Sequence, residues 1–525
     1  MRHTTTATIL LAACLSLQAG AAATPCTGQL GPARDTVAAE GLRRGAALIS
    51  AIEEHLSPAA DMTAAVRRNP ALHAGAFAGD LTQASVGFAL RSEEVAERMA
   101  AGDGEVSGSF AAESYRRLRH GGAVWGEAGY SRGTVRNVVW RSSADYDVVF
   151  PYITADSIGG DLFSEEYTFG GGYGRRGRRA AWGIEGGVRA LHEWRTVDPR
   201  PRSIAIDLDF RAGAALRAGR YMAGASFAAK VYKQTGDVDF YNPLGVKGEY
   251  HLSGLGAHFA RFTGVDAGSL YRGGGYAAML TLAPADAGEG LYLSLEYVRQ
   301  RVEKILVAYN NLPLQRIVPQ SVSFGAAWTA RSGAVRWGAA LRAQYDSRAG
   351  TESVVGEKIS NIYAVLAHLK MYGYSLATVR AEAFAERGAW CLVPWAEYRG
   401  MDEEYVYPAQ SRRTDRVAGG ADMVFTRGSE RMWLRLSAGG GYDAVLQGSL
   451  ALPVADIEAA IVEMVRHDFA RMSLGAAEAH VSLRADRVLR RESKKDNCFV
   501  GLVFEKYESD LDPLGIKSEA KAVLG

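Results

Sequence analysis

Hydrophobic and polar residues alternate along most of the chain, from about Ser107 to about Phe504. The clearest window sets Ile204, Ile206, Leu208 and Phe210 against Asp207, Asp209 and Arg211. Successive side chains on a β-strand point to opposite faces, so each such window predicts a strand with one apolar and one charged face. Comparable windows begin near Leu291, Val335 and Arg431.

The connections between these predicted strands fall into two classes that alternate along the chain. Short turns are expected near residues 119–122, 175–178, 216–219, 285–289, 331–334, 386–389 and 427–430. Longer links are expected near residues 132–162, 194–202, 233–271, 307–318, 347–365, 400–413 and 444–468. Bacterial outer-membrane barrels show this asymmetry, with short periplasmic turns and long external loops. A soluble β-sandwich has no reason to sort its connections in this way.

The sequence therefore predicts an all-β fold, a closed transmembrane antiparallel up-and-down β-barrel with a small, partly helical N-terminal segment. The expected strand number is about 16, with about 14 or about 18 as alternatives, because single-chain bacterial barrels have an even number of strands. Both chain ends are expected on the short-turn side, in the periplasm. A soluble, exported, β-rich domain is the main alternative.

Residues 1–23 have the pattern of a secretory signal peptide. A basic start is followed by an apolar run from Ala7 to Leu17 and by a stretch of small residues suited to cleavage. The run is shorter than the ~20 residues of a membrane-spanning helix. Leu11-Ala12-Ala13-Cys14 resembles a lipobox, so lipoprotein processing at Cys14 is an alternative.

Residues 24–104 interrupt the alternating pattern. Helical spacing runs from Ala33 to Leu56, a strand is expected at Leu81–Leu90, and a short helix at Glu93–Ala101. The segment is too polar for lipid, so it is expected in the periplasm or inside the barrel. The barrel itself is predicted over residues 105–506, followed by a polar periplasmic tail at 507–525.

Composition narrows the candidate partners. The net charge is +2 with 22% charged residues, so no nucleic-acid partner is expected. The expected partners are outer-membrane lipid and the barrel assembly machinery, with a periplasmic or surface protein as a further candidate. Three cysteines beyond the signal, Cys26, Cys391 and Cys498, do not make a disulfide framework, although one pair remains open.

One stretch carries a family resemblance. Residues 138–174, VVWRSSADYDVVFPYITADSIGGDLFSEEYTFGGGYG, with FAAESYRRL and VWGEAGYSRG before them, resemble an uncharacterised outer-membrane β-barrel family of the Bacteroidota. The likeness extends over roughly residues 107–506. It implies an outer-membrane location and no particular activity, because the family is a domain of unknown function. The polar tail after Phe504 departs from the aromatic residue on which such barrels commonly end.

The charged faces of the strands supply the first set of candidate functional residues. An outward-facing Arg or Lys at the bilayer midplane costs about 2–4 kcal/mol, so these side chains are expected to face the lumen. The predicted lumen-facing residues are Asp207, Asp209, Arg211, Glu296, Arg336, Arg342, Arg380, Glu382 and Arg435.

The first long link supplies the second set. Its candidates for an external binding surface are Trp140, Asp145, Tyr146, Asp147, Tyr152, Asp156 and Asp161. Clustered carboxylates are the ligands that calcium prefers, but their spacing matches no known calcium loop, so no metal and no cofactor is expected. The aromatic residues either form a binding surface or pack the link onto the barrel, and we favour packing.

The pattern favours a channel or uptake protein for small solutes, because barrels of ~16–18 strands are water-filled unless something plugs them. An accessory in secretion or surface assembly is the first alternative. A hydrolase is the second, but His192, His251, His258 and His368 lie in no recognisable catalytic motif. No enzymatic activity is therefore expected. A TonB-dependent transporter is disfavoured, because the leading segment is short for a plug domain and a barrel of ~22 strands needs more chain.

Overall fold

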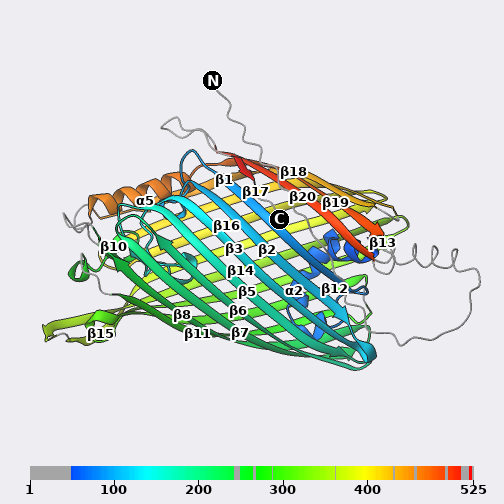
Figure 1. Ribbon diagram of the computed structural model, residues 1–525, viewed down its shortest axis with the longest axis horizontal. Coiled ribbons are helices and arrows are strands. Elements are labelled where there is room, and N and C mark those ends of the chain that lie inside the picture. Colours follow the sequence, from blue (N-terminus) through cyan, green and yellow to red (C-terminus); the bar gives the residue numbers. More distant parts are fainter. Residues whose placement is uncertain are drawn as a thin grey trace, which may run out of the picture.

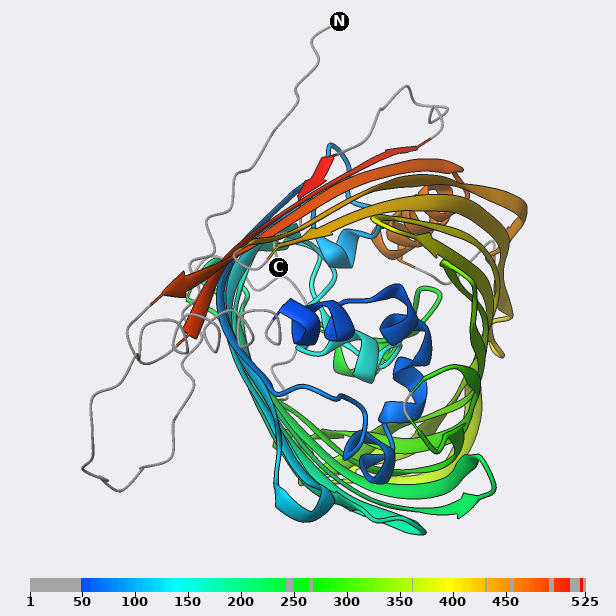
Figure 2. The same ribbon diagram turned by 90° about the vertical axis from the view of Figure 1, so that its right-hand side faces the viewer.

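The structure is a computed structural model that describes residues 49–522, except 242–248, 264–267, 287, 361, 430–431, 454–457, 491–494 and 510–519. Its main element is an 18-stranded sheet that curls into a barrel (Figure 1, Figure 2). The expected signal peptide, the lipobox at Cys14 and Cys26 lie outside the described residues.

The strands of the large sheet are β1 Leu81–Ser92, β2 Gly104–Arg117, β3 Gly122–Val138, β5 Gly160–Arg176, β6 Ala180–Arg195, β7 Arg200–Ala218, β8 Tyr221–Asp239, β11 Ser269–Pro284, β12 Gly290–Leu306, β13 Leu312–Ser332, β14 Val335–Ile359, β15 Ile362–Arg387, β16 Trp390–Tyr405, β17 Gln410–Gly428, β18 Met432–Ala451, β19 Ala476–Arg490, β20 Lys495–Ser509 and β21 Ala520–Ala522. The elements outside this sheet are α2 Pro58–Arg67, α3 Pro70–His73, η1 Met99–Ala101, η2 Arg119–Gly121, α4 Tyr146–Val149, β4 Thr154–Ala155, β9 Tyr250–Gly254, β10 Ala257–His258, η3 Ala260–Phe262, η4 Val307–Tyr309 and α5 Ala459–Met472. Residues 49–55 are also helical.

The outer surface of the barrel is apolar. Ile204, Ile206, Leu208 and Phe210 of β7 are all 42–54% exposed, as are residues of the same kind on nearly every other long strand. Their charged neighbours in sequence point the other way. The transmembrane antiparallel up-and-down β-barrel is therefore confirmed, with its small helical N-terminal segment. Among the described helices, none is long and apolar enough to cross a membrane.

The sheet has eighteen strands, which was an alternative to the expected sixteen, and the two further strands lie at its ends. Without β1 and β21 the sheet has sixteen strands, which is the number expected for residues 105–506. β1 begins at Leu81, inside the segment expected to lie outside the barrel wall, and pairs with β2 along its whole length. The expected helix at Glu93–Ala101 is reduced to the single turn η1.

Closure of the barrel is also less direct than expected. The described residues show no pairing between β1 and β20. The three residues of β21 pair with the end of β1, and two of them pair with β20 at Glu505 and Lys506. Every other contact between neighbouring strands of the wall extends over twelve or more residue pairs, as in β1–β2 and β18–β19.

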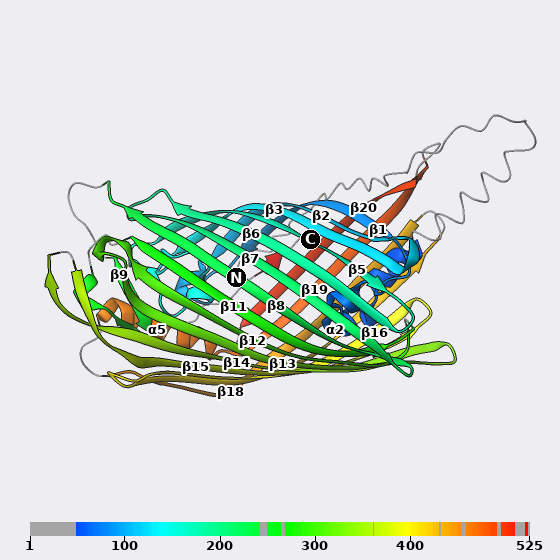
Figure 3. The same ribbon diagram turned by 90° about the horizontal axis from the view of Figure 1, so that it is seen from below.

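The two classes of connection lie at opposite ends of the barrel. The short turns are all close to their expected positions, and Gly333 and Gly388 adopt there the positive φ angles of +59° and +62° that tight turns need. At the other end several expected long links are instead continuations of the strands, so that β14 and β15 project beyond the barrel as a hairpin (Figure 1). Figure 3 shows α2 at the short-turn end and α5 at the long-link end.

The expectation that both ends of the sheet lie on the short-turn side was wrong for the C-terminal end. β1 starts at the short-turn end, but each strand reverses direction, so β20 starts at the turn after β19 and finishes at the long-link end. At the N-terminal end, the additional strand β1 places the start of the sheet on the short-turn side. At the C-terminal end, β21 runs back from the long-link end, antiparallel to β20.

Candidate functional site

Two groups of residues occupy the barrel lumen. We call residues 49–78, with α2 and α3, the helical plug, because these helices lie inside the ring of strands near the short-turn end (Figure 2). We call residues 139–159 and 249–258 the loop plug, because β4, β9 and β10 of these two links form a separate three-stranded sheet. The loop plug lies at the long-link end.

Local sequence explains why the helical plug is helical. Ser57 caps α2 by accepting a hydrogen bond from the Ala60 amide, and Pro58 occupies the first helical position. Asn69 and Pro70 repeat this arrangement at the start of α3, where the Asn69 Oδ1 accepts from the Ala71 amide at 3.1 Å. Such side chains are preferred caps, and proline is tolerated at this position because its missing N–H has no helical partner.

Charged wall residues hold the helical plug in place. Arg68 lies 2.8 Å from Glu296 of β12, whose other oxygen lies 3.0 Å from Arg211 of β7. Arg342 of β14 donates to the Asp61 carbonyl at 3.1 Å, and Arg435 of β18 donates to the Leu56 carbonyl. These strands lie around much of the ring, so the helical plug is held from several sides.

A half-buried histidine, His73, lies where the helical plug meets β2 and β3. The ring of His73 lies 4.5 Å from that of Trp125 and 5.6 Å from that of Tyr115, measured between centroids. Burial and the nearby Arg67 lower the pKa of His73 to about 4, so this histidine is neutral in the docked plug. Burial also lowers the pKa of His55, which stacks on Phe77 in the same cluster.

The loop plug is held by ion pairs that are almost fully removed from water. Asp156 Oδ2 lies 2.8 Å from Arg195 Nη1 of β6, and the two side chains are 1% and 0% exposed. Arg141 makes contacts of 2.6 Å and 2.8 Å with both carboxylate oxygens of Glu193. Arg195 also donates to the Arg141 carbonyl at 2.8 Å, which joins the two pairs.

Wall strands on other sides of the barrel bind the loop plug through its backbone. Lys304 of β12 donates to the Ile153 carbonyl at 2.9 Å, and Tyr271 of β11 donates to the Tyr152 carbonyl at 3.0 Å. Arg348 of β14 donates to the Phe150 carbonyl at 3.1 Å. A link that contacts β6, β11, β12 and β14 at once must lie across the lumen and not outside it.

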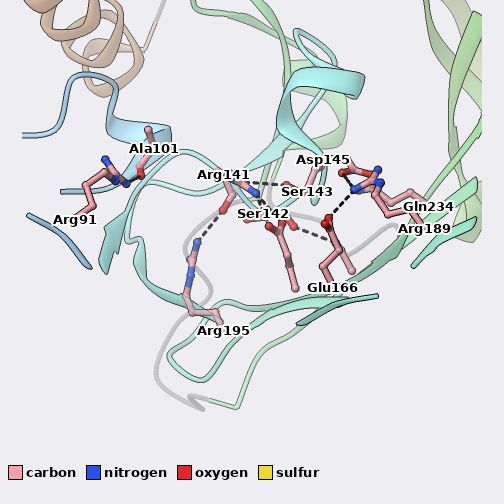
Figure 4. A network of polar contacts seen from close by, with 12 residues as sticks. Arg91, Ala101, Arg141, Ser142, Ser143, Asp145, Glu166, Arg189, Arg195 and Gln234 are labelled. Atoms are coloured by element: carbon pink, nitrogen blue, oxygen red, sulfur yellow. Dashed lines mark hydrogen bonds and ion pairs between the residues drawn. The ribbon is translucent and has the colours of Figure 1, made fainter. Parts of the chain in front are cut away.

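Arg189 of β6 connects the loop plug to the wall through three carboxylates, and Figure 4 labels two of them, Asp145 and Glu166. Its two terminal nitrogens lie 2.8 Å and 2.7 Å from the two oxygens of Asp145, a bidentate contact. They also lie 3.2 Å from Glu166 of β5 and 3.1 Å from Asp207 of β7. Tyr232 of β8 donates to Asp145 at 3.0 Å.

A cavity of about 330 Å³ adjoins this network, between the loop plug and the inner faces of β3, β5 and β6. Its lining residues are Ser131, Arg141, Asp145, Tyr146, Asp147, Val148, Ser164, Glu166, Arg189, Leu191 and Glu193. The volume lies within the range of small-molecule sites. Four carboxylates against two guanidinium groups make the lining acidic.

The nine residues expected to face the lumen all lie on the inner face of the wall. Glu296, Arg342 and Arg435 contact the helical plug directly. Most of the others form ion pairs with inner-face residues: Asp207 with Lys230, Arg211 with Glu296, Arg336 with Glu386, and Arg380, like Arg342, with Glu382. Asp209 lies between Asp207 and Arg211 on β7 and shares their face by alternation.

The residues expected in an external loop are in large part folded inward. Trp140, Tyr152 and Asp156 are at most 3% exposed, and Tyr146 packs against the same core. The acidic side chains Asp145 and Asp156 pair with wall arginines, so they are not a solvated loop surface. Only Asp147 and Asp161 remain exposed. The aromatic residues adopt the packing arrangement that we favoured.

Several residues that hold the plugs were not singled out from the sequence. They are Asn69, Arg141, Arg189, Glu193, Arg195, Tyr271 and Lys304. Arg176, at the end of β5, donates to the Gly75 carbonyl at 3.4 Å. For those of these residues that lie on strands, the inward position in the alternation was a usable signal, but their partners lie in distant segments.

The structure also places the other residues considered for metal binding, disulfide formation and catalysis. Within the described part of the chain, no three His, Cys, Asp or Glu side chains are grouped to hold a metal. Cys391 and Cys498 are free thiols, so they are not bonded to each other. His368 lies 3.2 Å from Ser353, but Ser353 donates to the Pro313 carbonyl at 2.5 Å and is a cross-strand neighbour of the histidine.

Comparison with family models gives a match over residues 70–521 to a family of unknown function, DUF6850. The chain belongs to this family. The match includes the resemblance centred on residues 110–174, α3, the sheet from β1 onward and the loop plug. A search of curated proteins gave no match.

Solved structures with some likeness to this family member are outer-membrane proteins. BauA, the ferric preacinetobactin receptor of Acinetobacter baumannii, is 9% identical with a TM-score of 0.37, over 84% of this chain and 75% of that one. The outer-membrane transporter YddB of Escherichia coli is 7% identical with a TM-score of 0.38, over 84% and 79%. At such low TM-scores the likeness carries no argument about function.

Proposed function

We propose that this protein is an outer-membrane uptake protein whose lumen is blocked at both ends and admits a small polar solute when the plugs move. The observation that carries the proposal is the inner arrangement of the barrel. A charged lumen of this width is suited to water and polar solutes, and two separate groups of residues fill it. An origin in the Bacteroidota stays a prediction.

The contacts of the plugs support movement more than permanent structure. Both plugs pack apolar side chains against the wall, such as Leu72 beside Met222 and Tyr152 beside Tyr372. They add polar anchors, as at Arg68–Glu296 and Arg195–Asp156. Replacing such a buried pair by apolar residues is often neutral or stabilising, so the charged anchors are weak evidence for stability alone. Polar anchors added to a packed apolar interface therefore suit a plug that can be released.

Outer-membrane insertion is tested by fractionation of cells that export the full chain. We expect the protein with the outer membrane, and we expect added protease to cut the β14–β15 hairpin in intact cells, because that hairpin projects at the long-link end. A soluble periplasmic fraction would overturn the location.

Passage of solutes is tested by swelling of liposomes in a small neutral sugar. The test variant lacks residues 49–75 and has residues 140–158 and 249–258 each replaced by a short Gly-Ser linker, which removes nearly all of both plugs and keeps β1. We expect fast swelling for this variant and slow swelling for the intact chain. Equal, slow swelling from two folded proteins would contradict the proposal.

We propose further that the protein has no enzymatic activity. The hydrolase alternative rests on a nucleophile and a base in contact, and Ser353 with His368 is the pair that approaches this geometry. The serine proton is directed at the Pro313 carbonyl, and Ser353 is only 4% exposed. We expect neither the intact chain nor Ser353→Ala to hydrolyse ester or peptide substrates. Hydrolysis by the intact chain that Ser353→Ala abolishes would contradict the proposal.

A further inference from the structure

The cavity beside Arg189 has more hydrogen-bond acceptors than donors. A carboxylate accepts at about four positions, whereas the guanidinium groups of this lining already point at carboxylates. Arg141 is committed to Glu193, and Arg189 to Asp145. The serines Ser131 and Ser164 add hydroxyl groups on the wall side of the cavity.

Glu166 has more unused capacity than Asp145 and Glu193. Its Oε2 accepts from Arg189 at 3.2 Å, the longest of the arginine's contacts to the three carboxylates. Its side chain is 35% exposed, against 8% for Asp145 and 11% for Glu193. Of these three carboxylates, Glu166 is therefore the most accessible to a cation in the cavity.

The remaining charges do not neutralise this excess. Asp207 is already shared between Arg189 and Lys230, which lies 3.2 Å from it. Asp147 has Arg98 at 3.9 Å, and that aspartate is 83% exposed. The Tyr146 ring borders the same cavity, with Arg98 5.6 Å from its centroid and Phe150 stacked on it at 5.2 Å.

We propose that this cavity is the recognition site for a small hydrophilic solute that carries a cationic amine. The amine binds Glu166 and the acceptor-rich side of Asp145, and the remainder of the solute lies along Ser131, Ser164 and Tyr146. The inference rests on the proposed uptake function, for which it supplies the class of solute.

The position of the cavity links binding to the loop plug. Asp145 belongs to the loop plug, whereas Glu166 and Arg189 belong to the wall. An ammonium group that pairs with Asp145 and Glu166 competes with Arg189 for both carboxylates. Binding therefore weakens the bidentate Arg189–Asp145 contact that holds α4 to β6.

The test is isothermal titration of the full chain in detergent with 1,4-diaminobutane, and with succinate and glucose, which have no amine, as comparison solutes. We expect saturable binding of the diamine, and we expect both comparison solutes to bind at least about tenfold more weakly. The Glu166→Gln variant should bind the diamine about tenfold or more weakly, because it loses a charge-assisted hydrogen bond.

Glu165→Gln is the matched control. Glu165 directly precedes Glu166 on β5, points to the other face of the sheet, and pairs with Arg132 at 3.3 Å. We expect its affinity to be within about twofold of the unchanged chain. Glucose or succinate binding as tightly as the diamine, or an equal effect of the two substitutions, would overturn the inference.

Failure of the site and failure of the uptake function are distinguishable. Swelling of liposomes by the plug-free variant without any diamine binding to the intact chain overturns the site and leaves the uptake function standing. Diamine binding that Glu166→Gln weakens, together with no swelling from the plug-free variant, overturns the uptake function and leaves the site standing.

Discussion

Asp156 and Arg195 form an ion pair of 2.8 Å at the long-link end of the barrel, where both side chains are excluded from water. The aspartate belongs to the loop plug and the arginine to the end of β6. Asp156 also accepts from the amides of Ile158 and Gly159, at 3.0 Å and 2.8 Å, so its carboxylate organises the end of the link as well.

Neutralising this aspartate should release the loop plug. In Asp156→Asn the Arg195 charge is left buried without its counter-charge, a loss of about 3–5 kcal/mol for pairs of this kind. Hydrogen exchange of the amides of residues 139–159 should become much faster. Asp161→Asn is the control, because Asp161 is exposed and accepts only from the Asn137 amide. Equal exchange in the two variants would show that the pair does not hold the plug.

Asn69 caps helix α3 and also binds the wall, and two substitutions can separate these contributions. Its Oδ1 caps α3, and its Nδ2 donates to Thr281 of β11 at 3.0 Å. Asn69→Ala should lose the cap, about 1 kcal/mol, and leave a buried hydroxyl without its partner, about 1–3 kcal/mol more. Ser57→Ala loses a cap and a hydrogen bond of 3.3 Å to the nearby Glu54 carbonyl, but no contact with the wall. Protection of the amides of residues 58–74 from hydrogen exchange should fall further in Asn69→Ala than in Ser57→Ala. An equal fall in the two variants would show that the hydrogen bond to Thr281 does not stabilise the docked plug.

Acid should undock the helical plug. His73 has a pKa of about 4 in the docked plug and about 6.5 when exposed, so the undocked state binds more protons between these values. The stabilisation of docking is complete above about pH 6.5 and is lost as the pH falls toward 4. His55 acts in the same direction, and Arg67 on α2 increases the repulsion.

The measurement is hydrogen exchange of residues 49–78 at pH 7.5 and at pH 5, corrected for the intrinsic rate. The correction is needed because exchange chemistry itself depends on pH. We expect less protection at pH 5, and a smaller pH effect in His73→Leu. Protection that is the same at both pH values in the unchanged chain would contradict the role of His73.

The orientation of the wall is tested by two neighbouring positions on β7. Leu208 lies near the middle of this strand on the outer face and is 44% exposed, and Asp209 follows it on the inner face. Leu208→Arg should cost about 2–4 kcal/mol in a bilayer, whereas Asp209→Arg should cost much less. Urea unfolding in lipid vesicles measures both. The reverse order would place the charged face against lipid.

The wall of the barrel could be predicted from sequence because its signal is local. Alternation at residues such as Ile206 and Asp207 is read within a few positions, and each turn lies between the strands it joins. β1 was harder, because its run of Thr82, Gln83, Ala84 and Ser85 has little apolar contrast and follows a helical segment.

The site could not be predicted because its contacts are distant in sequence. Asp145 and Asp156 look like solvated acids of an external loop, and their partners Arg189 and Arg195 follow 44 and 39 positions later. The local sequence pattern of residues 139–159 does not indicate that this link folds into the lumen. Its aromatic residues Trp140 and Tyr152 were the available signal, because large buried rings require a surface to pack against.

The most direct test of the plugged lumen is single-channel conductance in planar bilayers. Four proteins are compared: the intact chain, the variant without residues 49–75, the variant with residues 140–158 and 249–258 each replaced by a short linker, and the variant with both changes. The account predicts the largest and most persistent open steps for the double variant and a mostly closed intact chain. A double variant that folds, inserts and stays closed would contradict the claim that these two plugs block the lumen.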